Sequence, residues 1–252
     1  MDPAGSTFIF CDGFLLVRAG GLEPAGTEAL PELEQTRKVL DSFVVRPQGC
    51  VATGVSGAPD AAPAGCAWAR VRALVGAESP HAATACRALG LLNWRAMHRF
   101  CGACGGPLEE HPVEIARKCA ACGHVDYPSM APAVIVRVEK EGQILLARHV
   151  QRIPDLWTCL AGYVEVGESL EDCVRREVKE EAGIDVDDVR YVGSQHWPFP
   201  NQMMVGFRAR WKSGELKLQP EELSDARWFD PADLPNIPPP GSMAWRLIHG
   251  GG

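Results

Sequence analysis

The chain has 252 residues, of which 46% are hydrophobic and 23% charged, and its formal net charge is −7. This composition is typical of a soluble globular protein with room for two compact domains. The acidic balance argues against binding driven by Lys and Arg over nucleic-acid phosphates. No apolar run approaches the roughly 18 residues of a membrane-spanning helix. The first residues, MDPAGSTFIF, lack the basic start of a signal peptide, so we expect a cytoplasmic protein with no membrane partner.

Residues 1–97 contain short apolar segments separated by Gly and Pro, which predicts a small α+β domain. The turn pair Asp12-Gly13 separates the first two predicted strands. Apolar residues recur at spacings of three and four from Pro80 to His98, which predicts a helix. The domain shows no recognisable chemistry, and we expect it to support or dimerise the rest. The predicted strands are Phe8–Phe10, Phe14–Val17, Ser42–Arg46 and Gly49–Gly54.

Residues 98–127 contain two Cys-x2-Cys pairs in a C-x2-C-x14-C-x2-C spacing. Four thiolates complete a tetrahedral zinc shell, and a shell without an open position is structural. We therefore predict a zinc ribbon with one Zn²⁺ per chain. Two disulfides and a redox CxxC are the alternatives, which a reducing compartment and the paired spacing disfavour. The predicted ligands are Cys101, Cys104, Cys119 and Cys122.

The remaining six cysteines are scattered, several of them inside apolar segments, and are expected to be free thiols. They are Cys11, Cys50, Cys66, Cys86, Cys159 and Cys173.

Residues 128–252 form the largest predicted module, in which strands alternate with a few helices and indicate an α/β fold. A hairpin is predicted around the polar turn Glu139–Gly142, and a helix restarts over Ser242–Ile248 after the Pro-rich segment LPNIPPPG. The hairpin strands are predicted at Ala133–Val138 and Ile144–Ala147, and the other predicted strands are Val189–Val192, Met203–Arg210 and Ala226–Phe229.

An acidic amphipathic helix follows the turn at Gly162. Glu177, Glu180 and Glu181 fall at i, i+3 and i+4 and share one face, where like charges repel each other. A hard divalent cation with oxygen ligands would offset that repulsion. The opposite stripe of Leu170, Val174 and Val178, with Cys173 beside it, predicts a face packed on the core. Ser169 and Asp172 predict an N-terminal capping box.

The stretch GYVEVGESLEDCVRREVKEEAGI fits the pattern G-x5-E-x7-R-E-U-x-E-E-x-G-U, with U an aliphatic residue. Chance agreement is roughly 10⁻⁹ per start site at average residue frequencies. The stretch resembles the Nudix box. The resemblance implies an α/β/α sandwich with a mixed sheet, and hydrolysis of a nucleoside diphosphate linked to another group.

A second motif, SQHWPFP at Ser194–Pro200, is similar to the SQPWPFPxS signature of the NADH pyrophosphatase (NAD diphosphatase) family. That family also has an N-terminal domain, a four-cysteine zinc ribbon and a PPPG segment, all of which are found in this chain. Two positions depart from the signature: His196 replaces Pro, and Gln202 replaces Ser. The departures place the substrate preference in question, whereas the metal box is intact.

The resemblance implies that Glu177, Glu180, Glu181 and Glu222 are catalytic and, with the carbonyl of Ala161, hold two or more Mg²⁺ or Mn²⁺ ions. The general base, Glu181 or Glu222, stays open. Gly162, Glu168 and Arg176 are expected to support the box, the last two as an ion pair.

The resemblance also implies a set of substrate-side residues. Trp197 and Phe199 are suited to stack on nicotinamide or adenine, with plain core packing as the alternative. Arg72 is a candidate phosphate contact. The full set is Arg72, Tyr127, Tyr163, Gln195, His196, Trp197, Pro198, Phe199, Pro200, Asn201, Gln202 and Ala244.

The sequence therefore predicts a metal-dependent NAD(H) diphosphatase that yields NMN(H) and AMP, with the same chemistry applicable to NAD caps on RNA 5′ ends. The resemblance implies a homodimer whose sites draw on both subunits. The alternatives are a Nudix hydrolase for ADP-ribose or another nucleoside diphosphate derivative, and a zinc-ribbon binding module with an inactive hydrolase domain. Intact acids at every metal position argue against the inactive domain.

Overall fold

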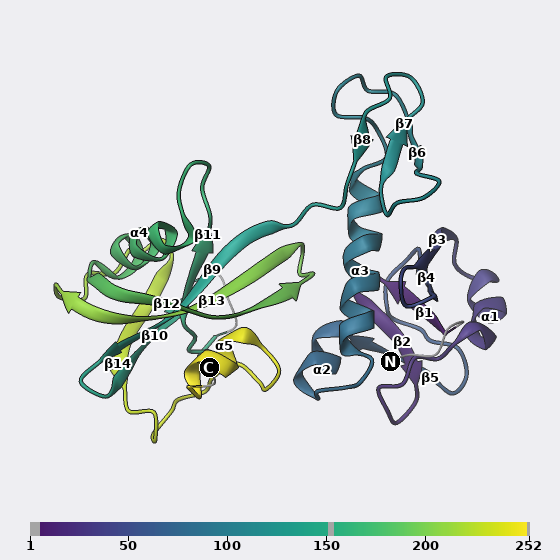
Figure 1. The fold of residues 1–252 in the computed structure, drawn as a ribbon. Helices are drawn as coiled ribbons and strands as arrows, with labels where there is room; N and C mark the ends of the chain where they lie inside the picture. Colours follow the sequence, from purple (N-terminus) through teal and green to yellow (C-terminus); the bar gives the residue numbers. More distant parts are fainter. Residues whose placement is uncertain (1–5, 151–153, 251–252) are drawn as a thin grey trace. The chain divides into compact units, whose positions relative to one another are not determined.

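The computed structural model describes residues 6–150 and 154–250 (Figure 1). The first five residues of the predicted N-terminal domain and the last two of the chain lie outside this description. The chain divides into two compact units. The first unit comprises Met1–Met130 together with Trp197–Asn201, and the second comprises Ala131–His196 and Gln202–Gly252.

The first unit contains a five-stranded sheet in the order β3-β4-β1-β2-β5. Strands β1 and β4 are parallel, and the other pairings are antiparallel. Asp12 and Gly13 both have positive φ, which is the backbone that a two-residue hairpin turn requires. The strands predicted in this region are confirmed. The bounds are β1 Thr7–Cys11, β2 Phe14–Arg18, β3 Val39–Val45, β4 Cys50–Val55 and β5 Cys66–Arg70.

Helices cover both faces of this sheet because successive side chains of a strand point to opposite sides. Phe8 and Phe10 pack with α2 (Val71–Gly76) and the predicted long helix α3 (Ala82–Met97). Ile9 and Cys11 pack with residues of the short helices η1 (Thr27–Ala29) and α1 (Leu30–Glu34). Strand β5 was not predicted, because its sequence CAWAR is short and Ala-rich.

The cysteine-rich segment forms a three-stranded antiparallel sheet of β6 (Leu108–Glu110), β7 (Arg117–Cys119) and β8 (Val125–Asp126). The buried Arg95 on α3 anchors this sheet. Its Nη1 lies 2.7 Å from Glu110 Oε1, while its Nε and Nη2 donate to Asp41 on β3 at 2.6 and 3.0 Å. Truncating such a buried guanidinium would leave both carboxylates without their partner.

The second unit contains a mixed sheet in the order β12-β13-β9-β10-β14, with β11 also paired to β9. Strands β9 and β13 are parallel, and β9 is antiparallel to both β10 and β11. The strands begin and end at β9 Ala131–Lys140, β10 Gln143–His149, β11 Leu160–Tyr163, β12 Asp185–Trp197, β13 Gln202–Ser213 and β14 Leu223–Phe229.

Helices α4 (Leu170–Ala182) and α5 (Met243–Ile248) cover opposite faces of the second unit's sheet. On one face, Val174 and Val178 of α4 pack with Val134 and Val136 of β9. On the other, α5 packs with Ile135 of the same strand. This arrangement confirms the predicted α/β/α sandwich with a mixed sheet.

None of the ten cysteines, all of which lie in the described ranges, forms a disulfide. In residues 6–150 and 154–250, no helix has both the length and the apolar character needed to cross a bilayer.

The two ends of α4 are fixed by local chemistry. Ser169 Oγ accepts a hydrogen bond from the backbone N–H of Asp172 at 3.1 Å and donates one to the Asp172 carboxylate at 2.7 Å. Gly183 ends the helix at φ 75°, and an added Cβ there would lie within 2.6 Å of Lys217. A glycine is required at this position both for its backbone angle and for the space.

Replacing Ser169 with Ala should lower the unfolding free energy of the second unit by about 1 kcal/mol, because one N–H of the first turn loses its acceptor. Ser169→Asp should retain most of the stability, because a carboxylate accepts the same bond. Calorimetric unfolding without added divalent metal measures both. Equal losses in the two variants would contradict a capping role.

Candidate active site and zinc centre

Three of the predicted catalytic glutamates, Glu177, Glu180 and Glu181, lie on α4, which packs with Leu160 of β11 in the core. Glu177 packs directly against Gly162 of β11, where an added Cβ would overlap its carboxylate. The box glycine therefore makes room for Glu177. Ala161 and Gly162 pair with Ile135 and Val134 of β9, so Gly162 lies inside strand β11 and the turn predicted at this glycine is wrong.

Arg176 lies at the centre of this cluster. Its Nε and Nη2 contact the two carboxylate oxygens of Glu168 at 3.0 and 2.6 Å, in the fork geometry that guanidinium and carboxylate share. Its Nη1 contacts Glu177 at 2.9 Å and Glu180 at 3.1 Å. Its Nη2 also donates to the carbonyl of Tyr163 at 3.0 Å. The ion pair expected between Glu168 and Arg176 is thus present, and it extends to two of the predicted metal ligands.

The carboxylates differ in environment. The Glu181 residue is 2% exposed, whereas the Glu180 side chain is 54% exposed. Burial raises the pKa of Glu177, against the opposing effect of Arg176, and the charges of Glu180 and Glu222 raise it further. Hydrogen bonds from Arg176 hold the pKa of Glu168 at about 2, so this carboxylate stays charged in its ion pair.

Glu222 approaches from a segment distant in sequence. The N–H groups of Lys217 and Gln219 donate to the carbonyls of Ala182 and Glu181 at the end of α4, at 2.9 and 3.0 Å. The Glu222 N–H then donates to the Gln219 carbonyl at 3.1 Å. The chain is thereby held against α4, which accounts for the influence of Glu222 on the pKa of Glu177.

The donor set fits a hard divalent cation. Glu177 packs against Gly162 of β11, and the charges of Glu180 and Glu222 act on it. Arg176 offsets the repulsion between Glu177 and Glu180 by contacting both. Oxygen donors of this kind suit Mg²⁺ or Mn²⁺. Glu177, Glu180, Glu181 and Glu222 would supply the side-chain ligands.

The four cysteines of the ribbon form a cluster in which the four sulfur atoms all lie within 4.8 Å of one another. Two of the separations are 3.7 Å, between Cys101 and Cys122, and 3.5 Å, between Cys104 and Cys119. A tetrahedral shell with Zn–S bonds of about 2.3 Å requires sulfurs about 3.8 Å apart. Backbone hydrogen bonds lower the pKa of Cys119 to about 7. The cluster therefore fits a structural zinc ion.

Among the predicted substrate-side residues, Gln195 connects two sequence motifs of the second unit. Its Nε2 donates to the carbonyl of Gly241, and its Oε1 accepts from the N–H of Met243, both at 2.8 Å. The signature strand β12 is thereby joined to the PPPG segment at the start of α5. Ala244 on that helix is buried in the core beneath the sheet. His196, which departs from the family signature, is half-buried near the end of β12.

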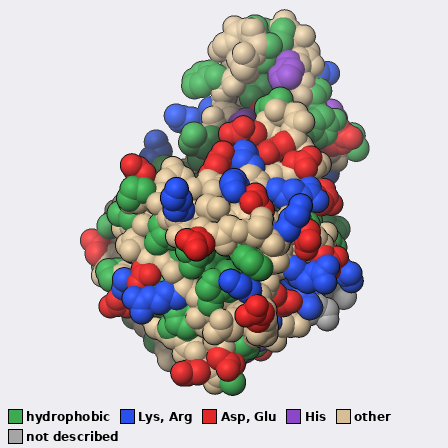
Figure 2. Space-filling view, turned by 90° about the vertical axis from the view of Figure 1, so that its left-hand side faces the viewer, with side chains coloured by type: hydrophobic (Ala, Val, Ile, Leu, Met, Phe, Trp, Pro, Cys, Tyr) green, Lys and Arg blue, Asp and Glu red, His purple; other side chains and the backbone are tan. Residues whose placement is uncertain are grey.

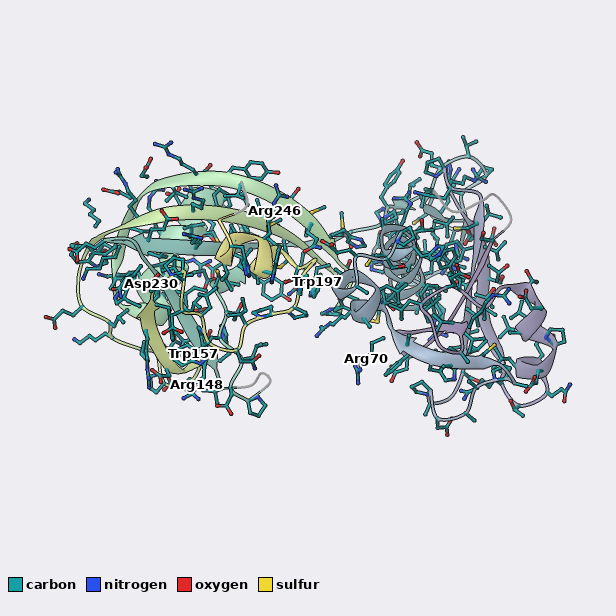
Figure 3. The ribbon with its side chains drawn as sticks, turned by 90° about the horizontal axis from the view of Figure 1, so that it is seen from below. Arg70, Arg148, Trp157, Trp197, Asp230 and Arg246 are labelled. Atoms are coloured by element: carbon teal, nitrogen blue, oxygen red, sulfur yellow. The ribbon has the colours of Figure 1, made fainter. Side chains whose placement is uncertain are left out.

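The segment Trp197–Asn201 belongs to the first unit. Trp197 (Figure 3) and Phe199 contact edge to face at 5.0 Å and pack against the core of that unit. The guanidinium of Arg72 lies 5.6 Å from the Trp197 ring centre and 4.7 Å from that of Phe199. Both rings therefore pack against the core of the first unit, which was the alternative to stacking on a substrate. Arg72 contacts the rings by a cation–π interaction.

Asn93 is a residue that the sequence reasoning missed. Its Nδ2 contacts the carbonyls of Pro198 and Pro200 at 3.5 and 3.3 Å. Its position on the amphipathic helix α3 carried no signal for this contact, which joins residues about a hundred positions apart. Asn201 of the same segment donates to the Ser129 carbonyl at 2.7 Å, and Tyr127 donates to Glu114 at 2.6 Å.

The family comparisons cover the segments that contain both candidate sites. The NUDIX domain matches residues 128–246, and the NADH pyrophosphatase zinc ribbon domain matches residues 96–127. The fold, the glutamate cluster and the ribbon together define a Nudix hydrolase with a zinc ribbon of the NADH pyrophosphatase type. Over 179 residues the chain is 46% identical to a Salmonella typhimurium protein named NAD-capped RNA hydrolase NudC, across 71% of this chain and 70% of the relative. The chain belongs to the NudC family.

Other relatives align over shorter ranges. A protein of the same name from Salmonella heidelberg is 48% identical over 163 residues, and the alignment covers 65% of this chain and 63% of the relative. A protein of the same name from Stutzerimonas stutzeri is 48% identical over 157 residues, and the alignment covers 62% of this chain and 57% of the relative. The chain thus spans less than two thirds of the length of these two relatives. A crystal structure of a Nitrosomonas europaea NUDIX hydrolase is similar over 61% of this chain and 87% of its own, with 26% identity and a TM-score of 0.49.

Replacing the buried Cys119 with Ser should lower the zinc content from about one ion per chain and destabilise the first unit, because three thiolates leave the shell incomplete. Elemental analysis by mass spectrometry and thermal unfolding measure the two effects. Cys66→Ser, outside the cluster, should retain the zinc. Full zinc occupancy in Cys119→Ser would contradict the four-cysteine shell.

Proposed function

We propose that this chain hydrolyses the pyrophosphate of NAD(H), giving NMN(H) and AMP. The observation that supports the proposal is the position of Glu177, which packs against Gly162 of β11 and is influenced by the charges of Glu180 and Glu222. Glu181 follows Glu180 on α4. A pyrophosphate repels an attacking hydroxide, and divalent ions supply charge neutralisation and a bound water of lowered pKa. The names of the NudC relatives, NAD-capped RNA hydrolase, support a dinucleotide as the substrate.

The residues of the cluster have different roles in the proposed reaction, according to their environment. Arg176 orients Glu177 and Glu180, and Glu168 in turn orients Arg176 by its two-point ion pair. The buried Glu181 lies on the same face of α4, where a carboxylate would both bind a cation and accept a proton from the attacking water. Two or more Mg²⁺ or Mn²⁺ ions are the cations that this oxygen-only donor set favours.

The same reaction would remove an NAD cap from an RNA 5′ end, because the pyrophosphate is chemically identical. The net charge of −7 disfavours binding of a polyanion by bulk electrostatics, and the face shown in Figure 2 carries interspersed acidic and basic side chains. We therefore propose that the cap, more than the RNA body, is recognised. We also propose that the protein is a homodimer and works in a reducing, cytoplasmic compartment. Light scattering after size-exclusion chromatography tests the oligomeric state.

The deciding experiment incubates the purified protein with NADH, NAD⁺, ADP-ribose and NAD-capped RNA, each with Mg²⁺ or Mn²⁺, and identifies the products. Release of AMP and reduced NMN from NADH is the expected result. Hydrolysis of ADP-ribose alone would overturn the choice of substrate.

Replacing Glu181 with Gln should lower kcat for NADH by about 10²-fold or more, because the amide neither holds a cation well nor accepts the proton. The exposed Glu171, on the same helix but outside the cluster, provides the matched control Glu171→Gln, which should keep nearly full activity. Steady-state kinetics with circular dichroism separate lost chemistry from lost fold. Near-normal kcat in Glu181→Gln would contradict the assignment.

A further inference from the structure

Tyr163 ends the strand that passes over the glutamates. Gly162 faces α4 and its glutamate, so the alternation along β11 places Tyr163 on the opposite face of the sheet, which α5 covers. The Tyr163 backbone is fixed, because its carbonyl accepts hydrogen bonds from Arg176 at 3.0 Å and from the Cys173 thiol at 3.4 Å. The residue is nevertheless 51% exposed. An accessible aromatic side chain thus follows directly on Gly162, the residue of β11 against which Glu177 packs.

Gln202 begins β13 and lies on the same face of the sheet as Met204, which packs in the core beneath α5. Its Nε2 donates a hydrogen bond to the Tyr163 hydroxyl at 2.5 Å. This bond joins β11 to β13 across the intervening strand β9, where Tyr163 pairs with Ala133 and Gln202 pairs with Ala131.

The register explains why these residue types meet. Strands on either side of β9 lie about 9–10 Å apart, a gap that only two long side chains close. The alanines between them, Ala131 and Ala133, are small enough to let the side chains cross. Serine, which the family signature has in place of Gln202, is too short to reach the Tyr163 hydroxyl. Gln202, which departs from the signature, therefore makes a contact with Tyr163 that serine could not make.

We propose that Gln202 is a positioning residue that fixes the Tyr163 ring as a platform for a flat heterocycle of the dinucleotide. An exposed tyrosine loses rotamer freedom when it stacks on a ligand, and a ring already held by Gln202 loses less. Stacking on an aromatic face suits nicotinamide and adenine alike. The inference rests on the proposed function, and it assigns part of the substrate affinity to a hydrogen bond outside the glutamate cluster.

A double-mutant cycle tests the bond. Gln202→Met keeps the length of the side chain without its donor, and Tyr163→Phe keeps the ring without its hydroxyl. Each should raise KM for NADH by about 3- to 10-fold, the worth of one hydrogen bond, with kcat within about two-fold of the parent. The double variant should resemble either single variant, because both remove the same interaction. The exposed Gln143 provides the control Gln143→Met, which should leave KM unchanged.

A second readout does not need activity. The chain has three tyrosines, so 3-fluorotyrosine labelling should give three fluorine resonances, which Tyr→Phe variants assign. Gln202→Met should shift the Tyr163 resonance and leave those of Tyr127 and Tyr191 in place. Addition of AMP or NMN to the parent protein should also shift the Tyr163 resonance.

The outcomes separate the two proposals. A parent protein that does not hydrolyse NAD(H) overturns the proposed function, whatever the resonances show. An active parent overturns the role of Gln202 if the KM effects of the two substitutions multiply in the double variant. An unshifted Tyr163 resonance in Gln202→Met has the same consequence.

Discussion

The contact of one guanidinium with three carboxylates is the interaction on which the glutamate cluster of the second unit depends. Glu177 and Glu180 carry like charges on one helical face, and Arg176 offsets their repulsion while Glu168 holds Arg176 from the preceding loop. The same guanidinium donates to the Tyr163 carbonyl. It therefore ties a loop, a helix and a strand together at the point where catalysis is proposed. The planar fork of arginine allows this, because lysine lacks its two-point geometry.

The sheet of the second unit divides the proposed site into two chemically distinct faces. The α4 face carries the acids that suit cations, and the α5 face carries the Tyr163–Gln202 pair and the Gln195 contacts to the PPPG segment. Alternation along β11 produces this division, since Gly162 and Tyr163 are adjacent in sequence but point to opposite sides. One short strand thus serves both the charged and the aromatic part of the site.

Local patterns predicted much of the fold, and the failures have physical causes. The amphipathic period of α4 and its Ser169 cap were readable because neighbours three and four residues apart determine them. Strand β5 was missed because a short Ala-containing segment is ambiguous until it pairs with β2. Trp197 and Phe199 illustrate the same limit. Their type suits both stacking and packing, and their contact with Arg72 depends on a residue more than a hundred positions away.

The sequence by itself determined which atoms are available: the spaced glutamates, the glycine that precedes them, and two cysteine pairs at a zinc-binding spacing. These features are local, so their spacing is enough to predict their chemistry. Tertiary structure alone decided which distant residues join them. Glu222 reaches the cluster because its segment bonds to the end of α4. Gln202 meets Tyr163, 39 residues away, because both strands flank β9 across small alanines. Strand order and register set such contacts, and neither is written in any local pattern.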